Sequence, residues 1–180
     1  MSPMTAESAP RVRHIIVVGG TPASWQDLSD QSWDAVLDDL GKVADHAGAN
    51  WLTMRPYGPL PASPSPLVTR EVEVGGCRVV ADPVGDGRER LAAAARAVLA
   101  ATGAITAERL DAHLNRPAEA DPDLVVVLGP PNALPPSLVW ELAYSELVFI
   151  DVPWEQLAAQ HVEDALATFA RRHRRFGGID

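Results

Sequence analysis

Short apolar runs alternate along the chain with longer segments in which apolar residues recur at helical spacing. Residues 12–18 are rich in β-branched side chains, which is typical of a strand buried on both faces. In residues 33–46 the apolar side chains recur every three to four positions, as they do on one face of a helix. This alternation predicts a single α/β layered domain with a mainly parallel central sheet flanked by helices.

The same pattern predicts the remaining elements. The expected strands cover residues 50–54, 68–74, 77–81, 123–127 and 147–152. The expected helices cover residues 88–102, 106–114, 137–145 and 154–173. Residues 56–66 contain five prolines in eleven positions, which excludes regular structure there.

Composition narrows the class of protein. A chain of 180 residues with 47% hydrophobic and 22% charged residues suits one globular domain, which we expect to cover residues 11–180 after a disordered N-terminus at 1–10. The single Cys77 excludes an internal disulfide. No apolar run approaches a membrane span, and residues 1–10 lack a signal peptide's apolar core, so we expect a cytoplasmic protein, at most peripheral to the membrane through a product. The net charge of −9 argues against a nucleic-acid partner.

The last ten residues have the opposite charge, with four arginines and two glycines. Arginine is a rigid fork of donors that suits phosphate oxygens, and glycine lets backbone N–H groups approach an anion. Arg175-Phe176-Gly177 is therefore a candidate diphosphate clamp. The alternative is an ordinary helix end, because cations near the last turn and a glycine after it also stabilise a helix C-terminus.

The segment from residue 123 onward resembles the C-terminal part of cis-prenyltransferases, the family of undecaprenyl and dehydrodolichyl diphosphate synthases. The resemblance rests on the strand at 123–127, Gly129-Pro130-Pro131, the run at 138–154 and the Arg-Arg-Phe-Gly-Gly ending. Residues 14–20 and Trp25 are similar to the family's first strand and catalytic loop.

The chain differs from this family at positions where the resemblance implies diphosphate-binding and metal-binding residues. The resemblance implies an aspartate for Mg²⁺ and the allylic diphosphate where this chain has Gly20. It implies two arginines and a serine for isopentenyl diphosphate where the chain has Val127, Ala133 and Pro135, whose side chains donate no hydrogen bonds. Glu146 stands at the family's second acidic position and is a possible residual acidic site. We therefore expect no catalytic residues and no bound metal in this chain alone, and Mg²⁺ only in a partner's active site.

The chain also resembles the non-catalytic subunit of heteromeric cis-prenyltransferases, the Nogo-B receptor type. That resemblance implies a heterodimer or heterotetramer with a catalytic subunit, in which Arg175 and the Gly177 N–H bind isopentenyl diphosphate across the interface and Phe176 anchors the tail. Aromatic residues are enriched at interface anchors. The sequence thus predicts interface positions at Trp140, Tyr144, Phe149 and Trp154.

Three hypotheses follow. The chain is an accessory subunit of a heteromeric cis-prenyltransferase, a homodimeric pseudoenzyme that binds an isoprenoid diphosphate, or an unusual enzyme that uses Glu146 with Mg²⁺. The first is favoured because the tail is present while the loop arginines are absent. Two other features have ordinary structural interpretations: His14 is expected to be a hydrogen-bonded core histidine, and Asp86 the N-cap of the following helix.

Overall fold

The computed structural model describes residues 11–58 and 67–176, with side chains through Arg172. Its six strands are β1 (His14–Val18), β2 (Trp51–Arg55), β3 (Arg70–Val74), β4 (Cys77–Ala81), β5 (Leu124–Leu128) and β6 (Glu146–Ile150). Its helices are α1 (Pro22–Gln26), α2 (Asp30–His46), α3 (Gly87–Ala100), α4 (Ala107–Leu114) and α5 (Ala159–Phe176). Two short 3₁₀ turns, η1 (Glu141–Ala143) and η2 (Trp154–Gln156), flank β6.

The strands form one sheet in the order β3-β4-β2-β1-β5-β6. β1 lies at its centre and pairs in parallel with β2 and β5, while only β3 runs antiparallel, as a hairpin with β4. All residues of β1 and β5 are buried, as expected for strands covered on both faces. The predicted α/β domain with a mainly parallel sheet is confirmed.

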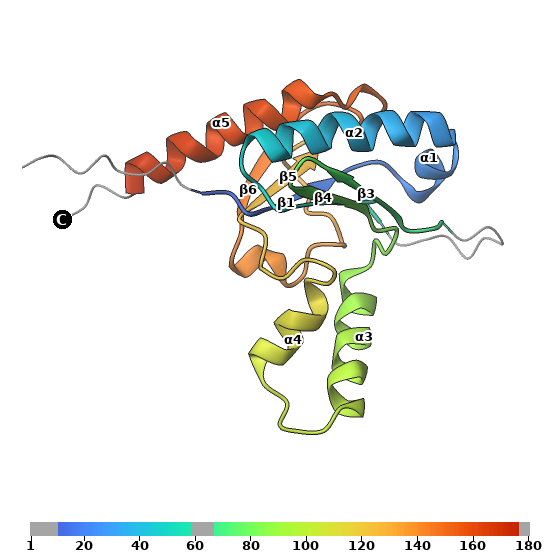
Figure 1. Ribbon diagram of the computed structural model, residues 1–180, viewed down its shortest axis with the longest axis vertical. Coiled ribbons are helices and arrows are strands. Elements are labelled where there is room, and N and C mark those ends of the chain that lie inside the picture. Colours follow the sequence, from blue (N-terminus) through green and yellow to red (C-terminus); the bar gives the residue numbers. More distant parts are fainter. Residues whose placement is uncertain (1–10, 59–66, 177–180) are drawn as a thin grey trace, which may run out of the picture.

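The two faces of the sheet are covered differently. α2 and α5 lie over one face, where most of the apolar core is found, while α3 and α4 form a hairpin that extends away on the other side (Figure 1). A smaller apolar cluster on that second face is formed by five buried residues, namely Ile16, Val18, Val125, Val127 and Leu138. The helical hairpin is therefore anchored near its root and leaves its far end in solvent.

Two predicted helices differ from the structure. Residues 137–145 form only the turn η1, because buried Leu138 and the inward-facing Glu141 hold this short connection against the sheet. The predicted helix over 154–173 begins only at Ala159, since Leu157 has an extended backbone (φ −58°, ψ 128°). This break allows Trp154 to enter the core.

His14 is a buried structural residue, as the sequence predicted. Its Nδ1–H donates to the Ala120 carbonyl at 2.9 Å, which leaves Nε2 to accept a hydrogen bond from the Thr53 hydroxyl at 3.0 Å. Burial disfavours the imidazolium and lowers the pKa of His14 to about 4.

This lowered pKa makes stability pH-dependent. Between pH 6.5 and 4 the unfolded chain binds a proton at His14 that the folded chain excludes, so the free energy of unfolding should fall as the pH falls, by about 3 kcal/mol in total. Urea denaturation at pH 7 and pH 4 measures this change. His14→Gln should flatten the dependence, whereas His46→Gln, at an exposed position, should leave it intact. An unaltered slope in His14→Gln would contradict the assignment.

Candidate functional site

The carboxyl ends of the parallel strands meet at one edge of the sheet, which is where open α/β sheets bind ligands. Gly20 follows β1, Arg55 ends β2, Asp82 follows β4 and Gly129 follows β5. The family resemblance assigns its diphosphate chemistry to this edge. We therefore take it as the candidate site.

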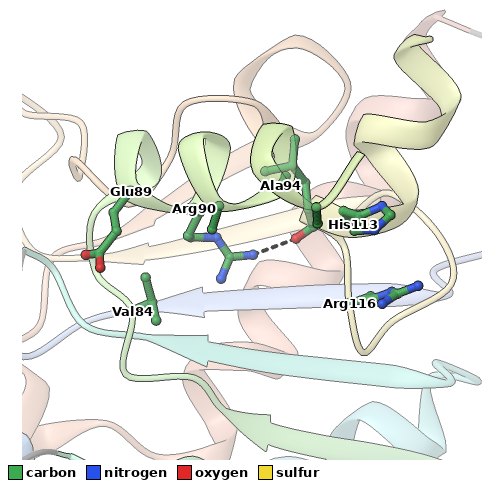
Figure 2. Close-up of a pocket in the computed structure, with 9 residues that line it drawn as sticks. Val84, Glu89, Arg90, Ala94, His113 and Arg116 are labelled. Carbon is green, nitrogen blue, oxygen red and sulfur yellow. Dashed lines mark hydrogen bonds between the residues drawn. The ribbon is translucent and has the colours of Figure 1, made fainter. Parts of the chain in front are cut away.

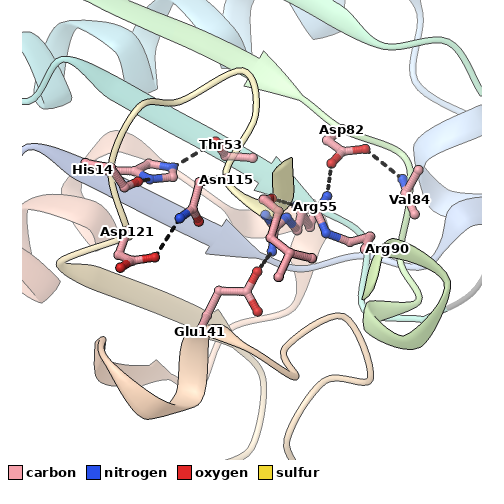
Figure 3. A network of polar contacts seen from close by, with 11 residues as sticks. His14, Thr53, Arg55, Asp82, Val84, Arg90, Asn115, Asp121 and Glu141 are labelled. Atoms are coloured by element: carbon pink, nitrogen blue, oxygen red, sulfur yellow. Dashed lines mark hydrogen bonds and ion pairs between the residues drawn. The ribbon is translucent and has the colours of Figure 1, made fainter. Parts of the chain in front are cut away.

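A buried ionic network occupies part of this edge (Figure 3). Arg55, 1% exposed, donates from Nη1 to Glu141, which is 5% exposed and belongs to η1. Arg90 of α3 forms an ion pair with Asp82 and also donates to the Leu114 carbonyl at 2.6 Å. Strand ends, α3 and η1 are thus joined through two arginines and two carboxylates.

The charges of this network balance internally. Burial opposes ionisation of Glu141, but Arg55, a backbone hydrogen bond and the Arg90 charge together outweigh burial and hold the pKa of Glu141 below its ordinary value. Burial, together with the nearby Arg55 charge, lowers the pKa of Arg90 to about 10, so Arg90 stays protonated at neutral pH. Because each arginine already faces a carboxylate, the network offers little net positive charge to an incoming diphosphate.

Gly20 lies in a crowded corner of the same edge. Its backbone has φ +72°, which side chains rarely adopt, and an added Cβ would lie 2.8 Å from Cγ of Trp154 and 2.9 Å from Cδ1 of Trp25. The two indole rings stack with centroids 5.7 Å apart, and Trp33 meets Trp25 edge-on at 4.9 Å. Tryptophan rings therefore occupy the space that a side chain at position 20 would enter.

The positions corresponding to the family's isopentenyl-diphosphate residues are also occupied differently. Val127 is buried in the smaller apolar cluster, and Pro135 is buried as well. Ala133 is exposed, and its carbonyl accepts a hydrogen bond from the Tyr57 hydroxyl at 3.0 Å. None of these three side chains carries a hydrogen-bond donor.

Glu146 lies at the opposite edge of the sheet. It begins β6 and pairs in register with Leu124, the first residue of β5, whereas Gly20 follows the other end of β1. Its carboxylate accepts a hydrogen bond from Arg172 at 3.0 Å. Within one chain, Glu146 and Gly20 thus belong to different sites. Among the described residues, no three or more His, Cys, Asp or Glu side chains are grouped to hold a metal ion.

The four predicted interface aromatics have different surroundings. Tyr144 is 67% exposed, Phe149 is half-buried against the smaller apolar cluster, and the Trp140 indole N–H donates to Asp111 of α4. Trp154 is only 8% exposed because its indole packs on Trp25, so it is a core residue rather than a surface anchor.

Three exposed apolar residues missing from the sequence-based prediction precede Tyr144 in the chain. We call the set the η1 surface, and it consists of Leu134, Val139, Leu142 and Tyr144. The helix predicted over 137–145 concealed this arrangement, because it implied a different periodicity of buried and exposed positions.

The tail lies at the limit of the described structure. Arg175 and Phe176 belong to the last turn of α5, but their side chains lie outside the described residues, as does Gly177 entirely. At the start of α3, Asp86 is the N-cap, as predicted, and its carboxylate accepts from the Arg88 N–H at 2.8 Å.

A groove of about 310 Å³ separates the roots of α3 and α4 (Figure 2). Its apolar wall is formed by Val84, Ala93, Ala94, Ala97 and Leu114. His113 and Arg116 stand at one end and Glu89 at the other, while Arg90 turns its guanidinium toward the Leu114 carbonyl. The groove thus combines an apolar lining with the charged side chains of Arg116 and Glu89 at its ends.

The fold defines a class of proteins. Lavandulyl diphosphate synthase from Lavandula x intermedia, solved with dimethylallyl diphosphate, superposes with a TM-score of 0.60 at 13% identity, over 89% of this chain and 95% of that one. A probable undecaprenyl diphosphate synthase from Campylobacter jejuni superposes with a TM-score of 0.62 at 15% identity, over 91% and 97%. At this identity the likeness establishes the α/β fold of cis-prenyltransferase structures.

The family follows from the sequence comparisons. The family model described as "Putative undecaprenyl diphosphate synthase" matches residues 84–177, more than half of the chain. The chain therefore belongs to the cis-prenyltransferase (undecaprenyl diphosphate synthase) family.

Individual relatives match over a shorter stretch. "Isoprenyl transferase 2" of Bradyrhizobium diazoefficiens is 47% identical over 75 residues, which is 42% of this chain and 30% of that protein. The undecaprenyl-diphosphate synthase of Escherichia coli K12, described as specific for (2E,6E)-farnesyl diphosphate, is 41% identical over 76 residues, with the same two shares. The matched stretch is thus less than a third of the length of these relatives.

Restoring the family's aspartate should fail on steric grounds. We expect Gly20→Asp to lower the free energy of unfolding by about 2–4 kcal/mol, because the side chain meets both a positive φ and two indole rings. Gly48→Asp is the matched control, since Gly48 has φ +80° with nothing within 4 Å of its added Cβ. Chemical denaturation should show a clearly larger loss at Gly20. Equal losses of unfolding free energy in the two variants would mean that the Trp25 and Trp154 rings move aside at little cost.

Breaking the buried ion pair should be costly. Glu141→Gln leaves the Arg55 charge buried without a carboxylate, so we expect a loss of about 3–5 kcal/mol in unfolding free energy. Lys42→Met, which removes an exposed ion pair with Asp38, should cost at most about 1 kcal/mol. Replacing both partners by Arg55→Met and Glu141→Leu should recover most of the loss. A loss in Glu141→Gln no larger than in Lys42→Met would refute the network's structural role.

Proposed function

We propose that this chain is the non-catalytic accessory subunit of a heteromeric cis-prenyltransferase, a polyprenyl diphosphate synthase. The proposal rests on one observation, which is that side chains of this chain already occupy the carboxyl edge of the sheet. Tryptophan rings occupy the space beside Gly20, and internal carboxylates engage both Arg55 and Arg90. A family member built in this way is poorly equipped to bind and ionise an allylic diphosphate by itself.

Prenyl transfer requires groups that stabilise the departing diphosphate. Departure of a diphosphate concentrates negative charge that Mg²⁺ and fixed cations must stabilise, and Mg²⁺ is usually held by carboxylates together with phosphate oxygens. Removing one preorganised electrostatic group costs about 2.7–4 kcal/mol of barrier. In this chain the aspartate and both loop arginines are replaced by Gly20, Val127 and Ala133. Mg²⁺ would accordingly belong to the partner's active site.

The η1 surface supports the existence of a protein partner. Its exposed apolar side chains lie on one segment that leads into β6, an edge strand of the sheet. Aromatic residues such as Tyr144 are enriched in interface cores. The proposed partner is a catalytic member of the same family, which this surface would contact while the tail reaches the partner's isopentenyl-diphosphate site through Arg175 and Gly177.

A second candidate function is a homodimeric pseudoenzyme that binds an isoprenoid diphosphate. The groove between α3 and α4 favours it, because an apolar wall and the Arg116 guanidinium at one end suit an apolar chain with an anionic head. The third hypothesis, an enzyme built on Glu146, loses support because Glu146 is ion-paired with Arg172 away from the carboxyl edge.

One experiment separates these functions. Isopentenyl-diphosphate incorporation is measured for this protein alone, for a full-length family member from the same source alone, and for the co-expressed pair. Activity that appears or rises strongly only in the pair supports the accessory subunit. Activity of this chain alone overturns it. If none of the three samples incorporates isopentenyl diphosphate, but calorimetry shows that this chain binds an isoprenoid diphosphate, the result favours the pseudoenzyme.

The tail gives the sharper prediction. Arg175→Ala should leave the complex assembled and reduce its turnover by roughly 10²-fold, mainly through weaker use of isopentenyl diphosphate, because a preorganised cation at the diphosphate is lost. Arg171→Ala is the matched control, since the Arg171 guanidinium donates to the Thr168 hydroxyl in the same helix. Steady-state kinetics of the pair tests both. If the complexes with Arg175→Ala and Arg171→Ala had equal turnover rates, the tail would be only the end of a helix.

A further inference from the structure

A recess of about 260 Å³ opens beside the carboxyl edge of the sheet and shares no lining residue with the groove between α3 and α4. Its walls come from α2 and from the segments that follow β1 and β6. Drug-sized molecules occupy pockets of about 300–1,000 Å³, so a recess of this volume suits a smaller ligand. The apolar part of its lining consists of Leu28, Val36, Trp154 and Leu157.

The polar part of the lining is acidic. It consists of Ser24, Asp27 and Glu155. The Ser24 hydroxyl is already engaged in the cap of α1, where it donates to the Thr21 carbonyl and accepts from the Thr21 N–H, both at 2.9 Å. Asp27 and Glu155 are exposed, and neither belongs to an ion pair among the described residues. No described lysine, arginine or histidine lines the recess, so its two carboxylates are not neutralised by their surroundings.

The walls of the recess are fixed by the tryptophan cluster beneath them. The Trp154 ring of η2 stacks on the Trp25 ring of α1 with centroids 5.7 Å apart, and the Trp33 ring of α2 lies 6.1 Å from that of Trp154. The Trp33 indole N–H also donates to the Trp25 carbonyl at 3.3 Å. These contacts hold the three elements together before any ligand arrives, which lowers the entropic cost of binding.

A cation with an apolar body is complementary to both parts of this lining. An ammonium group loses hydration when it enters a recess, and nearby carboxylates offset that cost by charge attraction. An indole ring adds to the attraction through its π electrons, which is how proteins recognise quaternary ammonium groups. The same two carboxylates repel an anionic ligand such as a diphosphate.

We propose that this recess binds a small organic cation, a quaternary or protonated alkylamine, with its alkyl groups on Leu28, Val36 and Leu157 and its charge beside Asp27 and Glu155. A small molecule suits the recess better than a protein surface does. Protein interfaces are centred on exposed apolar residues, and none of these apolar lining residues is among the large hydrophobic side chains exposed on the described surface. The inference goes beyond the proposed function and does not depend on it.

A nuclear magnetic resonance titration of the isotope-labelled full chain tests the proposal, with choline as the probe. The control ligand is the neutral alcohol in which a tert-butyl group replaces the trimethylammonium group of choline, because it keeps the shape and removes the charge. We expect choline to cause saturable shifts of the Trp154 indole N–H signal and of the Asp27 and Glu155 amide signals. The alcohol should bind at least about tenfold more weakly.

A double variant tests the role of the carboxylates. Asp27→Asn with Glu155→Gln should weaken choline binding at least about tenfold, because it removes both charges and keeps the size of the side chains. Glu119→Gln with Glu163→Gln is the matched control, since it removes the same charge at exposed positions outside the recess. This control should bind choline as the unmodified chain does.

Three results would overturn the proposal. The first is the absence of saturable shifts at Trp154 with choline, and the second is equal affinity for choline and the alcohol. The third is equal choline affinity of the two double variants. Circular dichroism and thermal melting of each variant establish that a lost signal reflects the recess and not unfolding. These measurements involve no prenyl transfer, so their failure leaves the proposed function untouched.

Discussion

The ion pair between Arg55 and Glu141 joins the end of a central strand to the connection that leads into the last strand. Both groups are almost entirely buried, so each depends on the other for its charge to be tolerated. The pair holds η1 against the sheet, and the position of η1 in turn presents the exposed residues around Tyr144. Because each buried charge must keep its partner, the ion pair holds the segment in a geometry that its own helical propensity does not provide.

The same buried charges define what this edge of the sheet offers chemically. Arginines at a strand end would normally attract a diphosphate. Here Glu141 and Asp82 occupy them, and Trp154 and Trp25 fill the space at Gly20. Packed indole rings and paired charges thus fill this part of the carboxyl edge and stabilise the fold there.

The η1 surface consists of exposed apolar residues, Tyr144 among them, on the segment that leads into the edge strand β6. Exposed aromatic and aliphatic side chains beside an edge strand suit contact with another protein.

The sequence by itself determined the parallel sheet, since β-branched runs such as that of β1 are stable only when both faces are covered. It also identified His14 as structural and Asp86 as a cap. Only the tertiary structure decided that Trp154 is a core residue, that Glu146 faces the opposite edge and that residues 137–145 form no regular helix. These outcomes depend on contacts between distant segments, such as Arg55 with Glu141 and Trp154 with Trp25, which local periodicity does not encode.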